Sequence, residues 1–158
     1  MLESRGVPHQ VVAFDPAIRS AVDVALAAGE DPRRVLKTLV VEQDPPGARP
    51  LLVMVPAPME LDLRHLAARL GVKRLRVATH TRAEQLTGLK VGGISALALA
   101  GRRFPAVIAA EAAAFESVLV SAGERGFDVE LSFADLVRLT GARVVPLADA
   151  GDYPSSSR

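Results

Sequence analysis

A glycine-rich segment holds the first residues whose types and spacing could support chemistry. Gly88, Gly92 and Gly93 lie within six residues, between a polar segment with helical periodicity and an apolar run. Glycines this close together let the backbone adopt positive φ angles and approach another group. Successive free N–H groups in such a turn form a concave site for a negative charge or a carbonyl oxygen. A turn that only reverses the chain is the alternative, and the spacing alone leaves both interpretations open.

The segment does not match two common glycine motifs. It is not a phosphate-binding P-loop, because no Lys-Ser/Thr pair follows the second glycine. It is not a nucleophile elbow, because residues 93–97, Gly-Ile-Ser-Ala-Leu, lack the second glycine of G-x-S-x-G. A serine nucleophile is therefore not predicted here.

A lysine interrupts an apolar strand pattern over residues 35–41. Alternation places Lys37 and Leu39 on one face of this strand, and Leu36 and Thr38 on the other. Lysines are almost never fully buried without a partner, so this position calls for an explanation. The alternatives to a functional role are protection of an edge strand, extension of the ammonium group to solvent, or a helix over the same residues.

The remaining composition excludes several kinds of site. The sequence has no cysteine, which removes disulfides, thiolate catalysis and zinc–thiolate sites. His9, His65 and His80 are scattered, and none has the spacing of a catalytic base or of an H-x-x-x-H metal motif. We therefore expect neither a metal nor a cofactor.

Length and charge bound the class of protein. With 158 residues and 49% hydrophobic residues, we expect one globular domain over residues 1–148, followed by a flexible, polar tail over 149–158. The 19 basic and 18 acidic residues nearly balance, so any nucleic-acid binding must come from a local patch. The N-terminus has no apolar signal core, and no apolar run approaches the ~20 residues that span a bilayer. These features predict a cytoplasmic protein that does not enter a membrane.

The periodicity predicts a mixed α+β domain whose central sheet is largely antiparallel and barrel-like, with helices around it. Helices are expected over 20–29, 61–70, 81–86 and 132–140, with a helical turn over 111–115. Strands are expected over 7–13, 35–41, 51–55, 75–78, 94–100, 106–109, 117–121, 127–131 and 144–145. The strands over 117–121 and 127–131 should pair as a hairpin.

The densest basic cluster follows and partly overlaps the second helix. Six basic or potentially basic side chains fall within thirteen residues, from Arg64 to Arg76. Such a helix face is usually solvated, and binding to nucleic-acid phosphates is the functional alternative. The candidates for this binding are Arg64, Arg69, Lys73 and Arg74.

Three segments, taken together and in order, resemble a known family. They are Leu-Lys-Thr-Leu at 36–39, Thr-Gly-x-x-x-Gly-Gly-Ile-Ser at 87–95 and Ser-Ala-Gly-x-Arg-Gly at 121–126. The set resembles the YbaK/prolyl-tRNA-synthetase-associated domain family, aminoacyl-tRNA deacylases that clear mischarged tRNA. The resemblance spans nearly the whole chain, from about Val7 to about Leu147. It implies the same fold class, the acceptor end of tRNA as partner, and prolyl-tRNA synthetase as a candidate partner.

The resemblance implies hydrolysis in trans of the ester of a mischarged tRNA, with tRNA-Pro carrying Cys or Ala as the expected substrate. The matching lysine of the family lines the active site, so Lys37, Gly92 and Gly93 are the catalytic candidates. Backbone N–H groups of the glycine segment would bind the developing oxyanion, and Lys37 would add a cation nearby. The ester is already activated, so a positioned water suffices and no protein nucleophile is required.

Further residues are expected to bind the substrate. Ser121 and Asp128 lie on adjoining strands and could hold the α-amino group or the ribose hydroxyls. The other candidates for substrate binding are Phe14, Thr38, Ile94 and Ser95.

The sequence departs from the family pattern at several positions. Leu89 replaces a frequent tyrosine, Ala96 and Ala98 replace a proline and a glycine, and Phe14 lacks a hydroxyl that some members carry. Pocket discrimination is worth only ~1–3 kcal/mol per methylene, so these changes affect the expected amino acid more than the expected activity. The alternative functions are a catalytically silent tRNA- or protein-binding regulatory module, or a globular domain with an unknown ligand.

Overall fold

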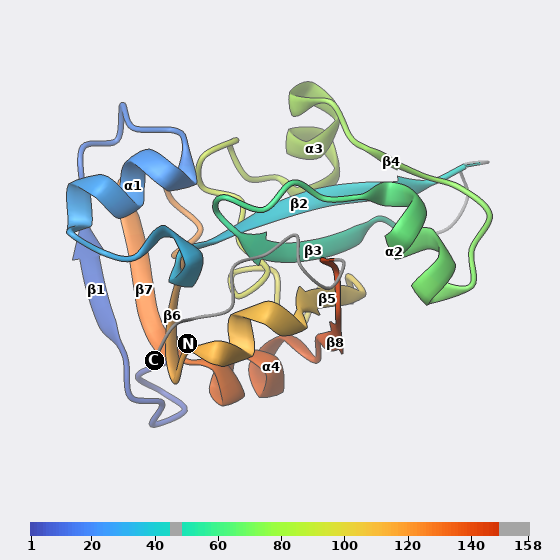
Figure 1. Ribbon diagram of the computed structural model, residues 1–158. Coiled ribbons are helices and arrows are strands. Elements are labelled where there is room, and N and C mark those ends of the chain that lie inside the picture. The colour runs from blue at the N-terminus through green and yellow to red at the C-terminus, as the bar shows by residue number, and fades with distance from the viewer. Residues whose placement is uncertain (45–48, 149–158) are drawn as a thin grey trace.

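The computed structural model describes residues 1–44 and 49–148, which form two β-sheets with helices around them (Figure 1). The larger sheet has the order β4 (Leu75–Val77), β2 (Leu36–Gln43), β3 (Leu51–Pro56), β5 (Ala106–Ala109), β8 (Arg143–Val145). The smaller sheet has the order β1 (Gln10–Ala13), β7 (Phe127–Ser132), β6 (Ser117–Ser121). The α-helices are α1 (Ala21–Ala28), α2 (Leu63–Leu70), α3 (His80–Thr87) and α4 (Phe133–Thr140), and the 3-10 helices are η1 (Pro32–Arg34) and η2 (Ala110–Ala114).

The predicted α+β class is confirmed, but the sheets do not close into a barrel. β2 pairs antiparallel with β3 and β4, whereas the β3–β5 and β5–β8 pairs are parallel. The strands of the smaller sheet are antiparallel throughout. The predicted hairpin of β6 and β7 is present, with Ser121 opposite Asp128. The expected tail over 149–158 lies outside the described residues.

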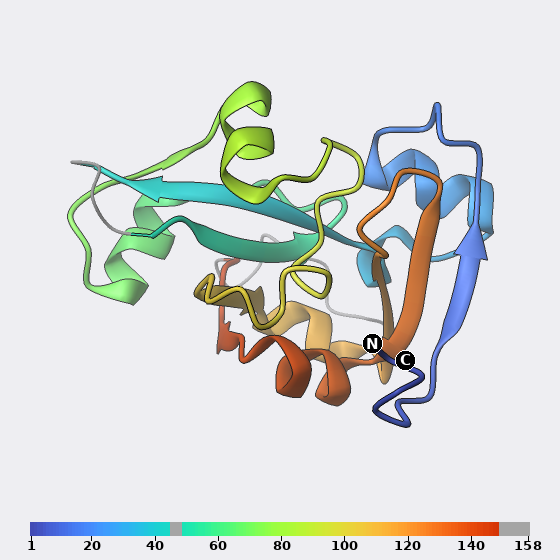
Figure 2. The same cartoon turned by 180° about the vertical axis from the view of Figure 1, so that it is seen from behind.

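The smaller sheet joins the larger one at the N-terminal end of β2 (Figures 1 and 2). Val35 forms a parallel bridge with Leu119 of β6. Next to it, the Arg34 guanidinium donates to the Ser117 carbonyl at 3.2 Å and forms ion pairs with Glu30 at 2.8 Å and Glu130 at 2.5 Å. These contacts hold the start of β2 against the hairpin.

The two faces of β2 pack into different cores, as the alternation predicts. Leu36 and Val40 belong to the cluster that also contains Ala96 and Leu97 of the glycine-rich segment. Val41 packs on the other face, in the cluster that includes residues of α2. The glycine-rich segment and α2 therefore cover opposite faces of the larger sheet.

The predicted starts and ends of the helices are confirmed where a capping residue specifies them. Ser20 accepts a hydrogen bond from the Asp23 N–H at 3.4 Å, and Asp62 accepts from the Arg64 N–H at 3.0 Å. Side-chain oxygens at these positions satisfy N–H groups that the first turn leaves free. Each α-helix is followed by a glycine in the left-handed conformation. No helix in the described parts of the chain has the length and apolar character of a membrane span.

The strand predicted over 94–100 is wrong, because the structure has a series of turns there. The Ser95 carbonyl accepts from the Leu99 N–H at 3.1 Å, and the Ser95 hydroxyl accepts from the Ala98 N–H at 3.1 Å. Ala96, Leu97 and Leu99 are all buried within this series of turns. The first strand is also shorter than predicted, since β1 begins at Gln10 rather than at Val7.

Candidate functional site

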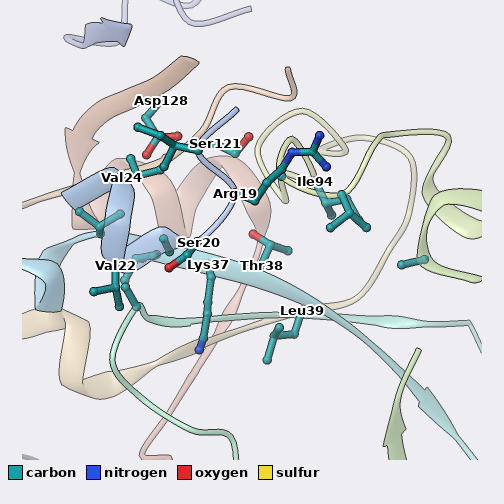
Figure 3. A pocket seen from close by; sticks show the side chains of 18 of the residues that line it. Arg19, Ser20, Val22, Val24, Lys37, Thr38, Leu39, Ile94, Ser121 and Asp128 are labelled. Carbon is teal, nitrogen blue, oxygen red and sulfur yellow. The ribbon is translucent and has the colours of Figure 1, made fainter. Parts of the chain in front are cut away.

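A cavity of about 420 Å³ lies between the first half of β2, the segment that leads into α1, the glycine-rich segment and the β6–β7 hairpin (Figure 3). Its volume is within the range of small-molecule sites. The predicted site residues that line it are Phe14, Lys37, Thr38, Gly92, Ile94, Ser121 and Asp128. Residues far apart in the sequence therefore meet at one place.

The edge of β2 is open where it borders the cavity. The Val35 carbonyl accepts from the Ala57 N–H on the β3 side, and the Val40 carbonyl accepts from the Ala78 N–H on the β4 side, each at 2.8 Å. Because peptide groups alternate in direction along an antiparallel strand, the N–H and C=O of Thr38 point to the β4 side. β4 pairs only with β2 residues beyond Val40, so the Thr38 backbone faces the cavity instead.

Asp128 contributes a buried carboxylate to the cavity. The residue is only 6% exposed, and no donor of the described chain lies within hydrogen-bond distance of its carboxylate oxygens. Burial raises the pKa of Asp128 to about 6. The opposite residue, Ser121, uses its hydroxyl to accept from the Gly123 N–H at 3.2 Å. A buried carboxyl group without a partner is poised to receive a cation or a hydroxyl from a ligand.

Lys37 lines the cavity, but its ammonium group points elsewhere. Figure 3 shows Nζ directed away from Ser121 and Asp128, on the side of β2 opposite the Thr38 hydroxyl. Burial lowers the pKa of Lys37, and the charge of Glu60 opposes this shift. The structure thus brings Lys37 to the cavity without placing its ammonium group next to the glycine amides.

Gly92 and Gly93 of the glycine-rich segment have different roles. Gly92 lines the cavity with a φ of +91°, a conformation that side chains disfavour. The Gly93 N–H already donates to the Lys90 carbonyl at 2.8 Å, and a Cβ at Gly93 would lie 3.0 Å from the Arg125 backbone nitrogen. Gly93 therefore permits close packing of two backbones, and the amides of Gly92 and Ile94 are the ones left for a ligand.

Ser95 does not line the cavity. It is fully buried, and its hydroxyl caps the turn that follows through the Ala98 N–H. The structure gives this residue a role in shaping the loop.

The predicted tRNA-binding residues also lie outside the cavity. Arg64 and Arg69 are exposed on α2, and Lys73 and Arg74 are exposed just after it. α2 lies at the end of the larger sheet away from the smaller sheet (Figure 1). Arg74 forms an ion pair with Asp44 at 3.5 Å. If these basic residues contact a substrate, they contact a part of it that lies far from the group bound in the cavity.

The sequence analysis missed Arg19, which lines the cavity next to Gly92. A Cβ built on Gly92 would lie 3.4 Å from the Arg19 Cδ. An isolated arginine before a helix N-cap carries no recognisable signal in the sequence, because the helix entry angle decides where its side chain goes. Among residues 1–44 and 49–148, no group of three or more His, Asp or Glu side chains could hold a metal ion.

Comparison with known proteins identifies the family and the fold. The family described as "Aminoacyl-tRNA editing domain" matches residues 15–139, which include β2, the glycine-rich segment and the β6–β7 hairpin. The chain belongs to this family. The resemblance drawn from the three sequence segments is thus confirmed, and Lys37, Gly92, Ser121 and Asp128 all fall inside the matched editing domain.

Relatives of the editing domain cover nearly the whole chain. A protein of Enterococcus faecalis, provisionally named Cys-tRNA(Pro)/Cys-tRNA(Cys) deacylase EbsC, is 32% identical over 90% of this chain and 87% of its own. A solved structure provisionally named as a trans-editing enzyme for prolyl-tRNA synthetase is 27% identical, with a TM-score of 0.79, over 94% of this chain and 92% of its own. The hypothetical protein APE2540 is 24% identical, with a TM-score of 0.82 over 94% of this chain and 96% of its own, and shares the fold.

Proposed function

We propose that this protein is a deacylase that hydrolyses, in trans, the ester of a mischarged aminoacyl-tRNA. Membership of the editing family supports this, as does a relative named as a deacylase of Cys-tRNA(Pro) and Cys-tRNA(Cys). The observation that carries the proposal is the cavity itself. It combines an unpaired, buried Asp128 with free amides of the glycine-rich segment at an open strand edge.

The free amides account for stabilisation of the transition state. Water attacks the ester carbonyl, and negative charge develops on its oxygen before the ribose oxygen leaves. The N–H groups of Gly92 and Ile94 donate to this oxygen. One such donor is commonly worth ~3–4 kcal/mol in the transition state. The reaction needs no protein nucleophile. His80 also lines the cavity, but within the described residues it forms no hydrogen bond with Ser20 or Ser121.

Asp128 and Ser121 orient the substrate. An α-ammonium group entering the cavity would pair with the Asp128 carboxylate, and this charge would lower the raised pKa of Asp128 and keep it ionised. The Ser121 hydroxyl can accept from the same ammonium group or bind a ribose hydroxyl. The Thr38 peptide group adds a donor and an acceptor at the open edge of β2.

Lys37 acts at the ester only after its side chain turns. In the structure the Lys37 side chain lies on the face of β2 opposite the Thr38 hydroxyl. The edge of β2 is open at this point, and the four-carbon side chain of lysine is flexible enough to pass around it. Burial lowers the pKa of Lys37, which means that the charged form is disfavoured where the side chain now lies, and a polar ligand at the open edge would favour that form. We therefore assign Lys37 to the substrate-bound conformation, as a cation near the ester or the terminal ribose.

The substrate class follows from the named relatives. Cysteine on tRNA-Pro is the first candidate because the EbsC relative carries that name, and alanine is the second because the cavity is small and lined with apolar side chains such as Val24 and Val35. Prolyl-tRNA synthetase is the proposed partner enzyme, in the cytoplasm where charged tRNA is used. The exposed cluster on and after α2 would contact phosphates of the tRNA body.

One observation favours a second function. Because the Lys37 ammonium group points away from the glycine amides, the same cavity could bind an aminoacyl end without turnover. Incubation with Cys-tRNA(Pro) and Ala-tRNA(Pro) separates the two functions. Released amino acid at a rate proportional to enzyme supports the deacylase, whereas binding without release supports a silent module. An Asp128→Asn variant should lose release while retaining its fold, and Asp23→Asn, on the exposed face of α1, serves as the control.

A further inference from the structure

Two arginine side chains lie against Gly92 at the cavity. A Cβ at Gly92 would be 3.4 Å from the Arg19 Cδ and 3.5 Å from the Arg125 Cγ. Arg19 comes from the segment before α1, and Arg125 comes from the turn between β6 and β7. Two cations thus converge on one backbone position from distant parts of the sequence. Like charges repel. The charge of Arg125 lowers the pKa of Glu84, so a carboxylate lies near Arg125, and Arg19 is the cation left for an anionic ligand.

The two arginines differ in how they are held. The Arg125 Nε donates to the Val91 carbonyl at 2.7 Å, which fixes that side chain against the glycine-rich segment. Arg19 is exposed, and within the described chain its guanidinium makes neither a hydrogen bond nor an ion pair. Figure 3 shows the Arg19 side chain extending along the cavity toward Ile94. Arg19 is therefore available to a ligand, next to an arginine that is already anchored.

The cavity consequently has an acidic side and a basic side. Asp128 supplies a buried carboxylate from β7, while Arg19, which lines the cavity, and Arg125, which lies behind Gly92, supply positive charge. The 3′-terminal aminoacyl nucleotide has the same arrangement, with an ammonium group on the amino acid and a phosphate on the 5′ side of the ribose. Guanidinium groups bind phosphate oxygens in a bidentate geometry that lysine cannot match.

We propose that Arg19, supported by Arg125, binds the 5′-phosphate of the terminal nucleotide and so orients the ester toward Gly92. The inference rests on the proposed deacylase function and adds a substrate-binding residue to it. Arg19 secures the non-reacting end of the nucleotide, while Asp128 secures the amino acid. Removing Arg19 should weaken binding of substrates that carry this phosphate and leave phosphate-free substrates unaffected.

Nucleotide binding tests this without any turnover. Wild type, Arg19→Ala and Arg143→Ala are titrated with adenosine 5′-phosphate and with adenosine at low salt, followed by NMR. Arg143 is a matched exposed arginine on β8, separated from β2 by β3 and β5. We expect wild type and Arg143→Ala to prefer the phosphorylated ligand at least tenfold, and Arg19→Ala to prefer it less than threefold. Equal binding of both ligands by wild type, or an undiminished preference in Arg19→Ala, overturns the assignment.

Kinetics with two substrates provide the second test. For Cys-tRNA(Pro), Arg19→Ala should raise KM about tenfold with kcat within twofold, and Arg19→Lys should recover part of the loss. For the cysteinyl ester of adenosine, which lacks the phosphate, KM should not change. An equal rise of KM for both substrates overturns the phosphate assignment. A wild-type protein that hydrolyses neither substrate overturns the deacylase proposal instead, and the nucleotide titration still decides the role of Arg19.

Discussion

Ser121 and Asp128 face each other across the paired strands β6 and β7, and both side chains enter the cavity. Directly opposite residues of an antiparallel pair lie on the same face of the sheet. One of them is a buried carboxyl group without a donor in the described chain, and the other is a hydroxyl group at half-buried depth. Ser121 and Asp128 therefore make the part of the cavity beside the hairpin polar and acidic.

The buried carboxyl group should make stability depend on pH. Its pKa is about 6 in the folded chain and near 3.8 when exposed, so the native state retains a proton that the unfolded state loses between these values. The free energy of unfolding therefore falls as pH rises from about 4 to about 6. Asp128→Asn should remove this dependence and stabilise the protein at pH 7 by up to about 3 kcal/mol, since each pKa unit is worth about 1.4 kcal/mol.

Urea unfolding at pH 4 and pH 7 measures this effect. The stability gap between Asp128→Asn and wild type should be larger at pH 7 than at pH 4. Asp23→Asn, the same substitution at an exposed position of α1, is measured beside it as the control. A gap of equal size at both pH values would contradict the burial of an unpaired carboxyl group.

Replacement of Lys37 separates activity from stability. Lys37→Ala should lower the rate of deacylation at least a hundredfold if its cation acts on the ester. Because burial lowers the pKa of Lys37, the ammonium form is disfavoured in the folded chain, so Lys37→Met should keep or raise the thermal midpoint. Amino-acid release from Cys-tRNA(Pro), measured beside thermal unfolding, checks both parts. A normal rate in Lys37→Ala would reject the catalytic role, and Lys90→Ala, an exposed lysine of the glycine-rich segment, is the control.

Two glycines with similar φ angles allow the effect of backbone strain to be distinguished from an effect on the site. Gly92 and Gly101 have φ angles of +91° and +88°, but only Gly92 lines the cavity, and a Cβ at Gly101 would meet nothing within 4 Å. Alanine at either position should cost roughly 1–2 kcal/mol of stability, because the left-handed region is strained for residues with a Cβ. Only Gly92→Ala should also lower kcat/KM, by at least tenfold. Equal activity of the two variants would exclude Gly92 from the site.

The basic cluster on and after α2 should act on tRNA alone. Arg69→Ala combined with Lys73→Ala should raise KM for Cys-tRNA(Pro) and reduce the salt dependence of binding by about one unit of slope for each lost phosphate contact. Hydrolysis of the cysteinyl ester of adenosine should not change, because these residues lie away from the cavity. Arg138→Ala on α4 is a matched control with an exposed arginine. An unchanged salt dependence in the double variant would show that this face is merely solvated.

Local patterns of residues are enough to specify several features of this protein. Ser20 and Asp62 specify helix starts through their own side chains, and the alternation over 35–41 correctly places Lys37 opposite Thr38. The same local rules failed over 94–100, where the Ser95 hydroxyl stabilises turns in an apolar run that resembled a strand. The three motifs, taken in order, also pointed to the family whose model matches residues 15–139.

Only the tertiary structure decided which groups meet. The alternation separates the two faces of β2, but long-range packing puts the glycine-rich segment on the Leu36 face, so the Lys37 ammonium group starts on the other side. The Lys90 carbonyl accepts from the Gly93 N–H, and Arg19 lies against Gly92 just before α1, which packs on Val35 and Leu119. Burial of Asp128 likewise comes from distant segments. Sequence periodicity determines the face of the strand on which a side chain lies. The groups that this side chain meets depend on contacts between elements far apart in the chain.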